Sequence, residues 1–260
     1  MSRGAFFWGG VLIIFGTMVL LDNLGVVSVN LWQWVGPSFL VLLGIYVLLG
    51  PFFSLGRMEN ASIPLGNFSS ARVKLAFGAG RLKIGAGSTA ENLLEGEFSG
   101  GIERHVRTYN GSLDVKLSLP IHSWPVFWGP GQIQWNIRFN SWVPLLVELN
   151  VGAAETILDL TDLVVNELLL QTGASSTEMT LPANAGISRF IIKAGAAAVN
   201  INVPQGVAAR IRASAGLGVV SVDKARFPRQ GGEYRSTDYD IAPNKVDLTI
   251  ETGLGSVDIR

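Results

Sequence analysis

Apolar residues dominate the first 56 positions of the chain. Eighteen residues without a charge separate Arg3 from Asp22, and no charge occurs between Asp22 and Arg57. A helix needs about 20 apolar residues, and about 17 at least, to cross the hydrocarbon core of a bilayer. A polar turn divides the stretch, so the pattern predicts a hairpin of two transmembrane helices, at about residues 5–21 and 33–53.

A cleaved signal peptide and a soluble helical hairpin fit this apolar stretch less well. A signal peptide would also have an Arg-bearing start and an apolar core, but no small-x-small cleavage site follows promptly. A soluble helical hairpin would keep a polar face on each helix. The positive charges of Arg3 and Arg57 flank the hairpin, so the positive-inside rule predicts that both ends, and the domain that follows, are cytoplasmic.

A short motif recurs after residue 57. It consists of glycine, Ala or Leu, and a small residue, followed by apolar residues at alternate positions. Its six copies begin at Gly78, Gly152, Gly173, Gly195, Gly216 and Gly253. The four copies from 152 to 216 are separated by 21, 22 and 21 residues, whereas the first and last steps are 74 and 37 residues. A regular period of this length indicates a repeat architecture.

Apolar residues alternate with polar ones on both sides of each glycine. In one copy Leu168 and Leu170 precede the glycine, and Thr177 and Met179 follow it. A period of two is typical of a β-strand with one buried face. Glycine supplies the conformational freedom that a sharp turn between two strands needs. We therefore predict an all-β, β-solenoid-like domain over residues 57–260. Its coils of about 21 residues should stack, because no coil can bury its apolar face alone.

A sandwich of β-hairpins is the alternative arrangement. Tight hairpins favour Asn-Gly or Asp-Gly turns, and only Asn110-Gly111 has this form, between residues 104–109 and 112–119. The early part of the domain is therefore predicted to be antiparallel and the later copies to coil.

Residues 120–144 interrupt the repeat with an aromatic segment, predicted to be a loop. It contains four prolines and an unusual density of large rings. One interpretation is a capping hairpin whose aromatic side chains cover the first coil. The other is an interaction surface for a membrane or a partner protein, formed by Trp124, Phe127, Trp128, Trp135 and Trp142.

The composition argues against most chemistry. Twenty basic residues balance 20 acidic ones, which gives no attraction to nucleic acid, and the absence of cysteine excludes thiol catalysis and thiolate metal sites. Two isolated histidines, His105 and His122, do not form a metal site or a triad, and no G-x-S-x-G motif occurs. The Gly-rich corners lack the third glycine of a phosphate-binding loop. We predict no enzyme activity, no cofactor and no metal.

The double span and the Gly-Ala corners together resemble the LiaF-like family of bacterial membrane proteins. The β region is similar to the toast-rack or adhesin-like domains. The segments that carry the resemblance are Trp135-Asn-Ile-Arg-Phe139, Val143-Pro-Leu-Leu-Val-Glu-Leu149, Gly152-Ala-Ala, Leu158-Asp-Leu-Thr-Asp-Leu163 and Leu168-Leu-Leu-Gln-Thr-Gly-Ala174. The resemblance implies a multi-pass protein of the bacterial cytoplasmic membrane that takes part in cell-envelope stress signalling. It also implies a sensor histidine kinase as partner and no catalytic residues.

Two hypotheses of function follow. The first is a membrane protein of the envelope stress response that regulates a sensor kinase or another envelope protein by contact, with the lipid bilayer as its anchor. The second is an extracytoplasmic adhesin-like or structural β module. A third, an enzyme that acts on lipid or glycan, is disfavoured because no acid–base constellation is visible.

Overall fold

The computed structural model describes residues 13, 37, 58–109, 111–120 and 133–260. The predicted transmembrane hairpin, with spans at 5–21 and 33–53, lies outside the described residues except for two helical positions, Ile13 and Pro37. None of the described residues belongs to a helix with the length and hydropathy required to cross a bilayer.

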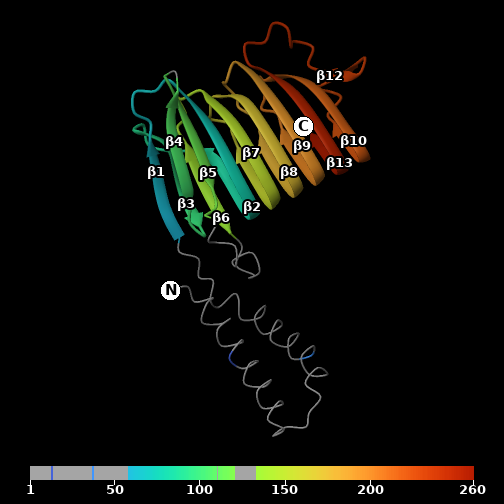
Figure 1. The fold of residues 1–260 in the computed structure, drawn as a ribbon. Helices are drawn as coiled ribbons and strands as arrows, with labels where there is room; N and C mark the ends of the chain where they lie inside the picture. Colours follow the sequence, from blue (N-terminus) through green and yellow to red (C-terminus); the bar gives the residue numbers. More distant parts are fainter. Residues whose placement is uncertain (1–12, 14–36, 38–57, 110, 121–132) are drawn as a thin grey trace, which may run out of the picture. The chain divides into compact units, whose positions relative to one another are not determined.

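The described domain is entirely β (Figure 1). Its strands are β1 (Met58–Pro64), β2 (Ser70–Ala86), β3 (Asn92–Ser99), β4 (Glu103–Tyr109), β5 (Ser112–Ser118), β6 (Gln134–Phe139), β7 (Leu145–Asp159), β8 (Val165–Thr180), β9 (Ile187–Asn202), β10 (Ala208–Val222), β11 (Arg229–Gln230), β12 (Glu233–Arg235) and β13 (Lys245–Ile259). They form one 13-stranded sheet in the order β1-β3-β6-β2-β7-β8-β9-β13-β10-β12-β11; in addition, β5 pairs with β2, and β4 pairs with β5. The prediction of an all-β, solenoid-like domain is confirmed.

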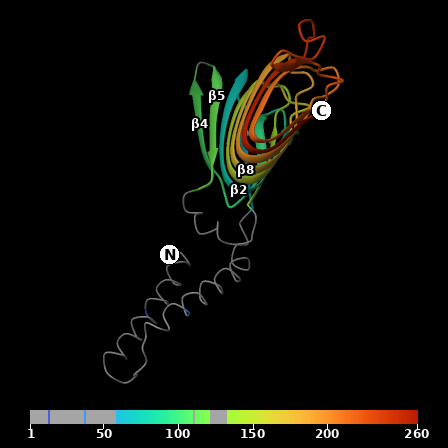
Figure 2. The same ribbon diagram turned by 90° about the vertical axis from the view of Figure 1, so that its right-hand side faces the viewer.

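Each of the six long strands bends in its middle, so that the sheet folds into a U with the core inside (Figure 2). The burial pattern of β9 explains the bend. Phe190 and Ile192 point inward before the corner, and Val199 and Ile201 point inward after it. Two successive exposed residues, Gly195 and Ala196, shift the alternation by one position. This shift keeps apolar side chains on the inside of both arms.

Neighbouring coils are parallel and in register. Ala153 pairs with Ala174, and Ala174 with Ala196, so the corner glycines lie in one row across the sheet. Short turns such as residues 160–164 connect the end of one coil to the start of the next.

The corner glycines are required by close packing rather than by backbone conformation. Five of them (Gly152, Gly173, Gly195, Gly216 and Gly253) have φ angles outside the left-handed region. A Cβ at any of these five positions would lie only 2.3–3.0 Å from the carbonyl oxygen of the glycine in the next coil. At these five positions glycine therefore lets one backbone approach another, and freedom in φ is used instead at Gly80 and Gly255, two positions further along their corners.

The last two coils do not stack in chain order. β13 lies between β9 and β10 and is parallel to both. Its inner residues are large and almost completely buried: Val246, Leu248, Ile250, Val257 and Ile259. The inner positions of β10 include the smaller Ala213 and Ala215, which are only half-buried. The more apolar strand, β13, thus lies between two other strands, where burial stabilises it more. The insertion at 223–242 connects the end of β10 to the start of β13.

The early strands are antiparallel only in part, because β5 and β6 both pair with β2 in parallel. β4 and β5 form an antiparallel hairpin from Glu103↔Ser118 to Tyr109↔Ser112, which confirms the expected pairing around residues 104–119. β5 then pairs with the first arm of β2, and β6 pairs with its second arm. These additional strands account for the long step between the first two glycines.

Candidate functional site

The row of corner glycines forms the floor of an open groove of about 810 Å³ on the outer surface of the domain. The absence of side chains at Gly152, Gly173, Gly195 and Gly253 creates this groove. Outward-facing polar side chains border it along one side: Asn150, Gln171, Lys193, Ser214 and Glu251. The groove crosses the coils at right angles to the strands and has mixed charge.

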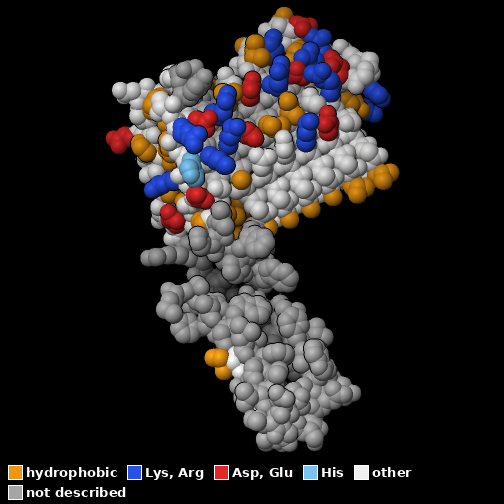
Figure 3. Space-filling view, viewed as in Figure 1, with side chains coloured by type: hydrophobic (Ala, Val, Ile, Leu, Met, Phe, Trp, Pro, Cys, Tyr) orange, Lys and Arg blue, Asp and Glu red, His pale blue; other side chains and the backbone are white. Residues whose placement is uncertain are grey.

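Apolar residues form a ridge next to the glycine row. The position after each glycine is occupied by Ala79, Ala153, Ala174, Ala196, Leu254 or Leu217. Figure 3 shows a single row of apolar side chains along the lower edge of the domain. Leu217 is 73% exposed and Leu254 50%, so the ridge is most apolar at the β13–β10 end of the sheet.

Charged residues on the first arms of the coils form cross-strand pairs. Lys74 lies 3.2 Å from Glu148, and Lys193 lies 3.8 Å from Glu251. Exposed pairs of this kind contribute little to stability. They leave the outer face with alternating charge, in agreement with the neutral composition.

The structure divides the predicted aromatic surface. Trp124, Phe127 and Trp128 lie outside the described residues. Trp142 is 84% exposed, and it stays a candidate for contact with a partner.

The prediction that Trp135 belongs to an interaction surface is wrong, because its side chain is 1% exposed. It lies on β6, with ring centroids 5.4 Å from Phe77 and 5.1 Å from Phe98, and its indole N–H donates to the carbonyl of Ser99 at 3.3 Å. Residues 134–139 are a strand rather than part of a loop, and the inward side chains of this strand are Trp135, Ile137 and Phe139. The capping interpretation of this segment accounts better for the tryptophan, since its ring fills the space between the arms.

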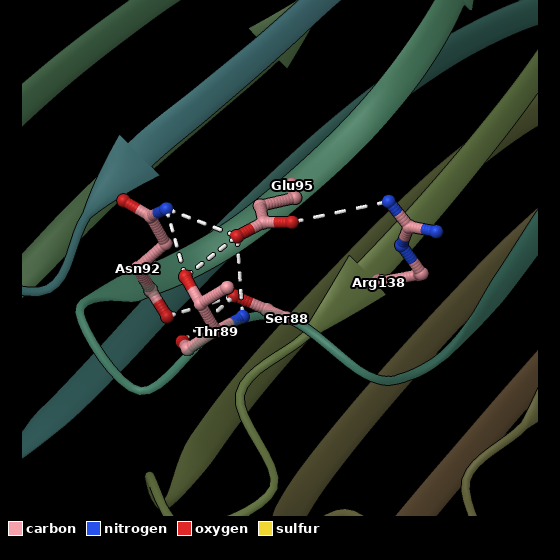
Figure 4. Close-up of polar contacts among 5 residues, drawn as sticks. All are labelled: Ser88, Thr89, Asn92, Glu95 and Arg138. Carbon is pink, nitrogen blue, oxygen red and sulfur yellow. Dashed lines mark hydrogen bonds and ion pairs between the residues drawn. The ribbon is translucent and has the colours of Figure 1, made fainter.

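Glu95 on β3 is held in a network that fixes the turn before this strand (Figure 4). One carboxylate oxygen accepts hydrogen bonds from the backbone N–H of Thr89 at 3.1 Å, from the Thr89 hydroxyl at 2.7 Å and from Asn92 Nδ2 at 3.0 Å. The other oxygen lies 3.8 Å from the guanidinium of Arg138. The hydrogen bonds from Thr89 and Asn92 lower the pKa of Glu95 to about 2. A carboxylate that is ionised, and whose oxygens are occupied by hydrogen bonds and an ion pair, is suited to hold a turn and not to transfer protons.

A second cluster fastens the insertion to the strands. The ring of Tyr239 has three cations near its face: Arg235 at 5.0 Å, Arg210 at 5.3 Å and Lys245 at 5.6 Å. Burial raises the pKa of Tyr239. Burial opposes ionisation of Asp247 as well, but hydrogen bonds from Arg210 and a second arginine outweigh it and keep the pKa of this carboxyl below its ordinary value. The cluster was not predicted, although the insertion is visibly rich in Arg and Tyr.

Among the described residues, no group of three or more His, Cys, Asp or Glu side chains could hold a metal ion. His105 is exposed on β4, and His122 lies outside the described residues. The described part of the domain therefore offers a groove, an apolar ridge and ionic clusters with structural roles.

Comparison with known proteins places this geometry in a family. No curated protein matches the chain. A solved structure of a candidate cell adhesion protein from Clostridium sporogenes is similar, with a TM-score of 0.69, 21% identity, and coverage of 78% of this chain and 98% of that one. A candidate adhesin from Parabacteroides distasonis has a TM-score of 0.24 and 10% identity over 80% of this chain and 98% of its own, which is too low to support an argument. Residues 54–202 match the family described as the N-terminal domain of toast_rack, DUF2154, and this chain belongs to that family.

Proposed function

We propose that the protein is a non-catalytic binding module of the bacterial cell envelope, anchored in the cytoplasmic membrane by its N-terminal helices, that acts by contact with another protein. The observation that supports this most is the outer surface of the coils. It combines a long groove over the glycine row, a parallel apolar ridge and mixed charge. Stacked repeats characteristically use such extended surfaces for binding.

The partner that we propose is a sensor histidine kinase, or another envelope protein, of the response to cell-wall damage. This step rests on the resemblance of the sequence to LiaF-like proteins and on the two apolar segments before residue 57. Contact would then take place at the cytoplasmic side, where the positive-inside rule locates the β domain.

Deletion of the gene tests the regulatory function. Basal output of a cell-wall stress reporter should change, and a chain with Trp142→Ala should restore it only in part, because an exposed tryptophan is a frequent contact in interfaces. A variant with Ile241→Ala, which also shortens a highly exposed apolar side chain but on the insertion, is the matched control. If reporter output stays the same after deletion under a panel of cell-wall antibiotics, the regulatory function is wrong.

Adhesion is the second candidate function, and the fold shared with the candidate cell adhesion protein of Clostridium sporogenes favours it. An adhesive module requires the β domain to be outside the cell. Protease added to intact cells or spheroplasts would then remove residues 58–260 and leave the anchor. Protection of this domain until the membrane is permeabilised would instead support the regulatory function.

A further inference from the structure

β10 forms an open edge of the sheet. It pairs with β13 along its whole length on one side. On the other side, only Arg210 and Ile211 pair, with β12 (Figure 1). On this second side, the backbone from Arg212 to the end of β10 has no neighbouring strand among the described residues.

This edge lacks the features by which proteins normally prevent strand pairing. Charged residues, proline and bulges on an edge discourage association. No charged residue or proline occurs from Ala213 to Val222, and the strand has no register shift against β13. Two large apolar side chains are exposed there, Leu217 at 73% and Val219 at 68%. In contrast, β4 at the opposite end of the domain has charged residues at Glu103, Arg104 and Arg107.

The inner face of the domain is also incomplete at β10. Ala213, Ala215 and Val220 occupy inward positions, but they are only partly buried because no further coil of the described residues covers them. A strand added at this edge would extend both arms of the sheet and bury these residues. The added strand must bend where β10 bends, and it must present small or apolar residues to the inside.

We infer that the strand added here is β10 of a second copy of this chain, in an antiparallel, two-fold symmetric pair. A dyad along the bisector of the bend exchanges the two arms of the U, so the second copy continues the same fold. Residues that face each other in an antiparallel pair point to the same side of the sheet. Inward residues of β10 have odd numbers before the corner, such as Ala213 and Ala215, and even numbers after it, such as Val220. Two paired residues therefore both point inward only if their numbers add to an odd sum.

In the register that is centred on the corner, the numbers of two paired residues add to 433. This register places Ala215 opposite Gly218 and Ala213 opposite Val220 on the inside, and Ser214 opposite Val219 on the outside. In this register the mate of Arg212 is Ser221. β12 covers the edge up to Ile211. In this register the open stretch 212–221 of one copy therefore pairs with the same stretch of the second copy.

Charge complementarity favours a second copy over an unrelated strand. Arg212 and Asp223 are the charged residues that flank the open stretch. Arg212 shares the carboxylate of Asp247 with Arg210, which leaves one excess positive charge. Asp223 has no ion pair among the described residues. In the two-fold register, Arg212 lies diagonally across from Asp223 of the second copy, and the contact occurs twice.

The oligomeric state of the full chain in detergent tests the pairing first. Sedimentation velocity should give a dimer, and Val219→Lys should raise the dissociation constant at least tenfold, because it puts a charge on each edge. Ile241→Lys, a charge at an apolar position 87% exposed on the insertion, should leave the dimer intact. A monomeric wild-type chain, or a dimer indifferent to Val219→Lys, would overturn the inference.

Engineered disulfides test the register, because the chain contains no cysteine of its own. The double variant Ser214→Cys, Val219→Cys should form a covalent dimer on mild oxidation, since these two positions face each other. The double variant Ser214→Cys, Ser221→Cys is displaced by two residues and should cross-link at least tenfold more slowly. Equal rates, or no cross-link because another segment or protein covers the edge, would refute the two-fold pair.

Discussion

Replacement of a corner glycine by alanine distinguishes conformational freedom from close packing as the reason for the glycine row. If glycine were needed for conformational freedom alone, Gly152→Ala would be tolerated, because φ at this residue lies outside the left-handed region. In such positions alanine typically stabilises by about 0.4–1 kcal/mol through the unfolded state. The structure predicts the opposite sign, because the new Cβ would lie 2.3 Å from the carbonyl oxygen of Gly78.

The magnitude follows from the contact distances. An ordinary contact between these atoms begins near 3.4 Å, so two neighbouring strands would have to separate by about 1 Å. Overpacking of this kind costs about 1–3 kcal/mol. We expect Gly152→Ala to lower the free energy of unfolding by about 2–3 kcal/mol. Gly173→Ala should cost about 1 kcal/mol, because its nearest contact, to Gly152 O, is longer at 3.0 Å.

Urea unfolding of the purified chain, followed by near-ultraviolet circular dichroism, measures these differences. The control is Gly232→Ala, at a residue with no atom within 4 Å of the added Cβ and no left-handed φ. It should be neutral or slightly stabilising. If Gly152→Ala were as stable as this control, or if the order of the three variants were reversed, the packing argument would be refuted.

Three further outcomes are expected. Glu95→Gln should destabilise the domain at neutral pH, and its deficit should vanish as the pH falls from about 4.5 towards 2. A depressed carboxylate pKa stabilises only while the group is ionised, and urea titrations at several pH values test this. Trp135→Ala should cost about 3–5 kcal/mol, whereas Trp142→Ala should change stability by less than about 0.5 kcal/mol; a similar loss for both would contradict the assigned burial. Asp247→Asn should lower the melting temperature, less so in 1 M salt, because it leaves Arg210 without its counter-charge.

The sequence determined the local structure of the β domain. Alternation around the glycines predicted inward and outward positions, and residues such as Leu168, Leu170 and Met179 are buried as expected. The near-constant spacing predicted stacked coils of about 21 residues, because a period of this length fits two short strands and two turns. The pair Asn110-Gly111 predicted the β4–β5 hairpin, since this turn chemistry is local.

The tertiary structure alone decided which coil lies beside which, and what each aromatic residue does. β13 lies between β9 and β10 because its larger inner side chains gain more from burial, a comparison that no single segment contains. Trp135 and Trp142 look equivalent in the sequence, yet one fills the core and the other is exposed. Local patterns specify strands and turns through short-range sterics. Strand order and burial depend instead on which distant surfaces fit together, and that is settled only when the whole sheet has formed.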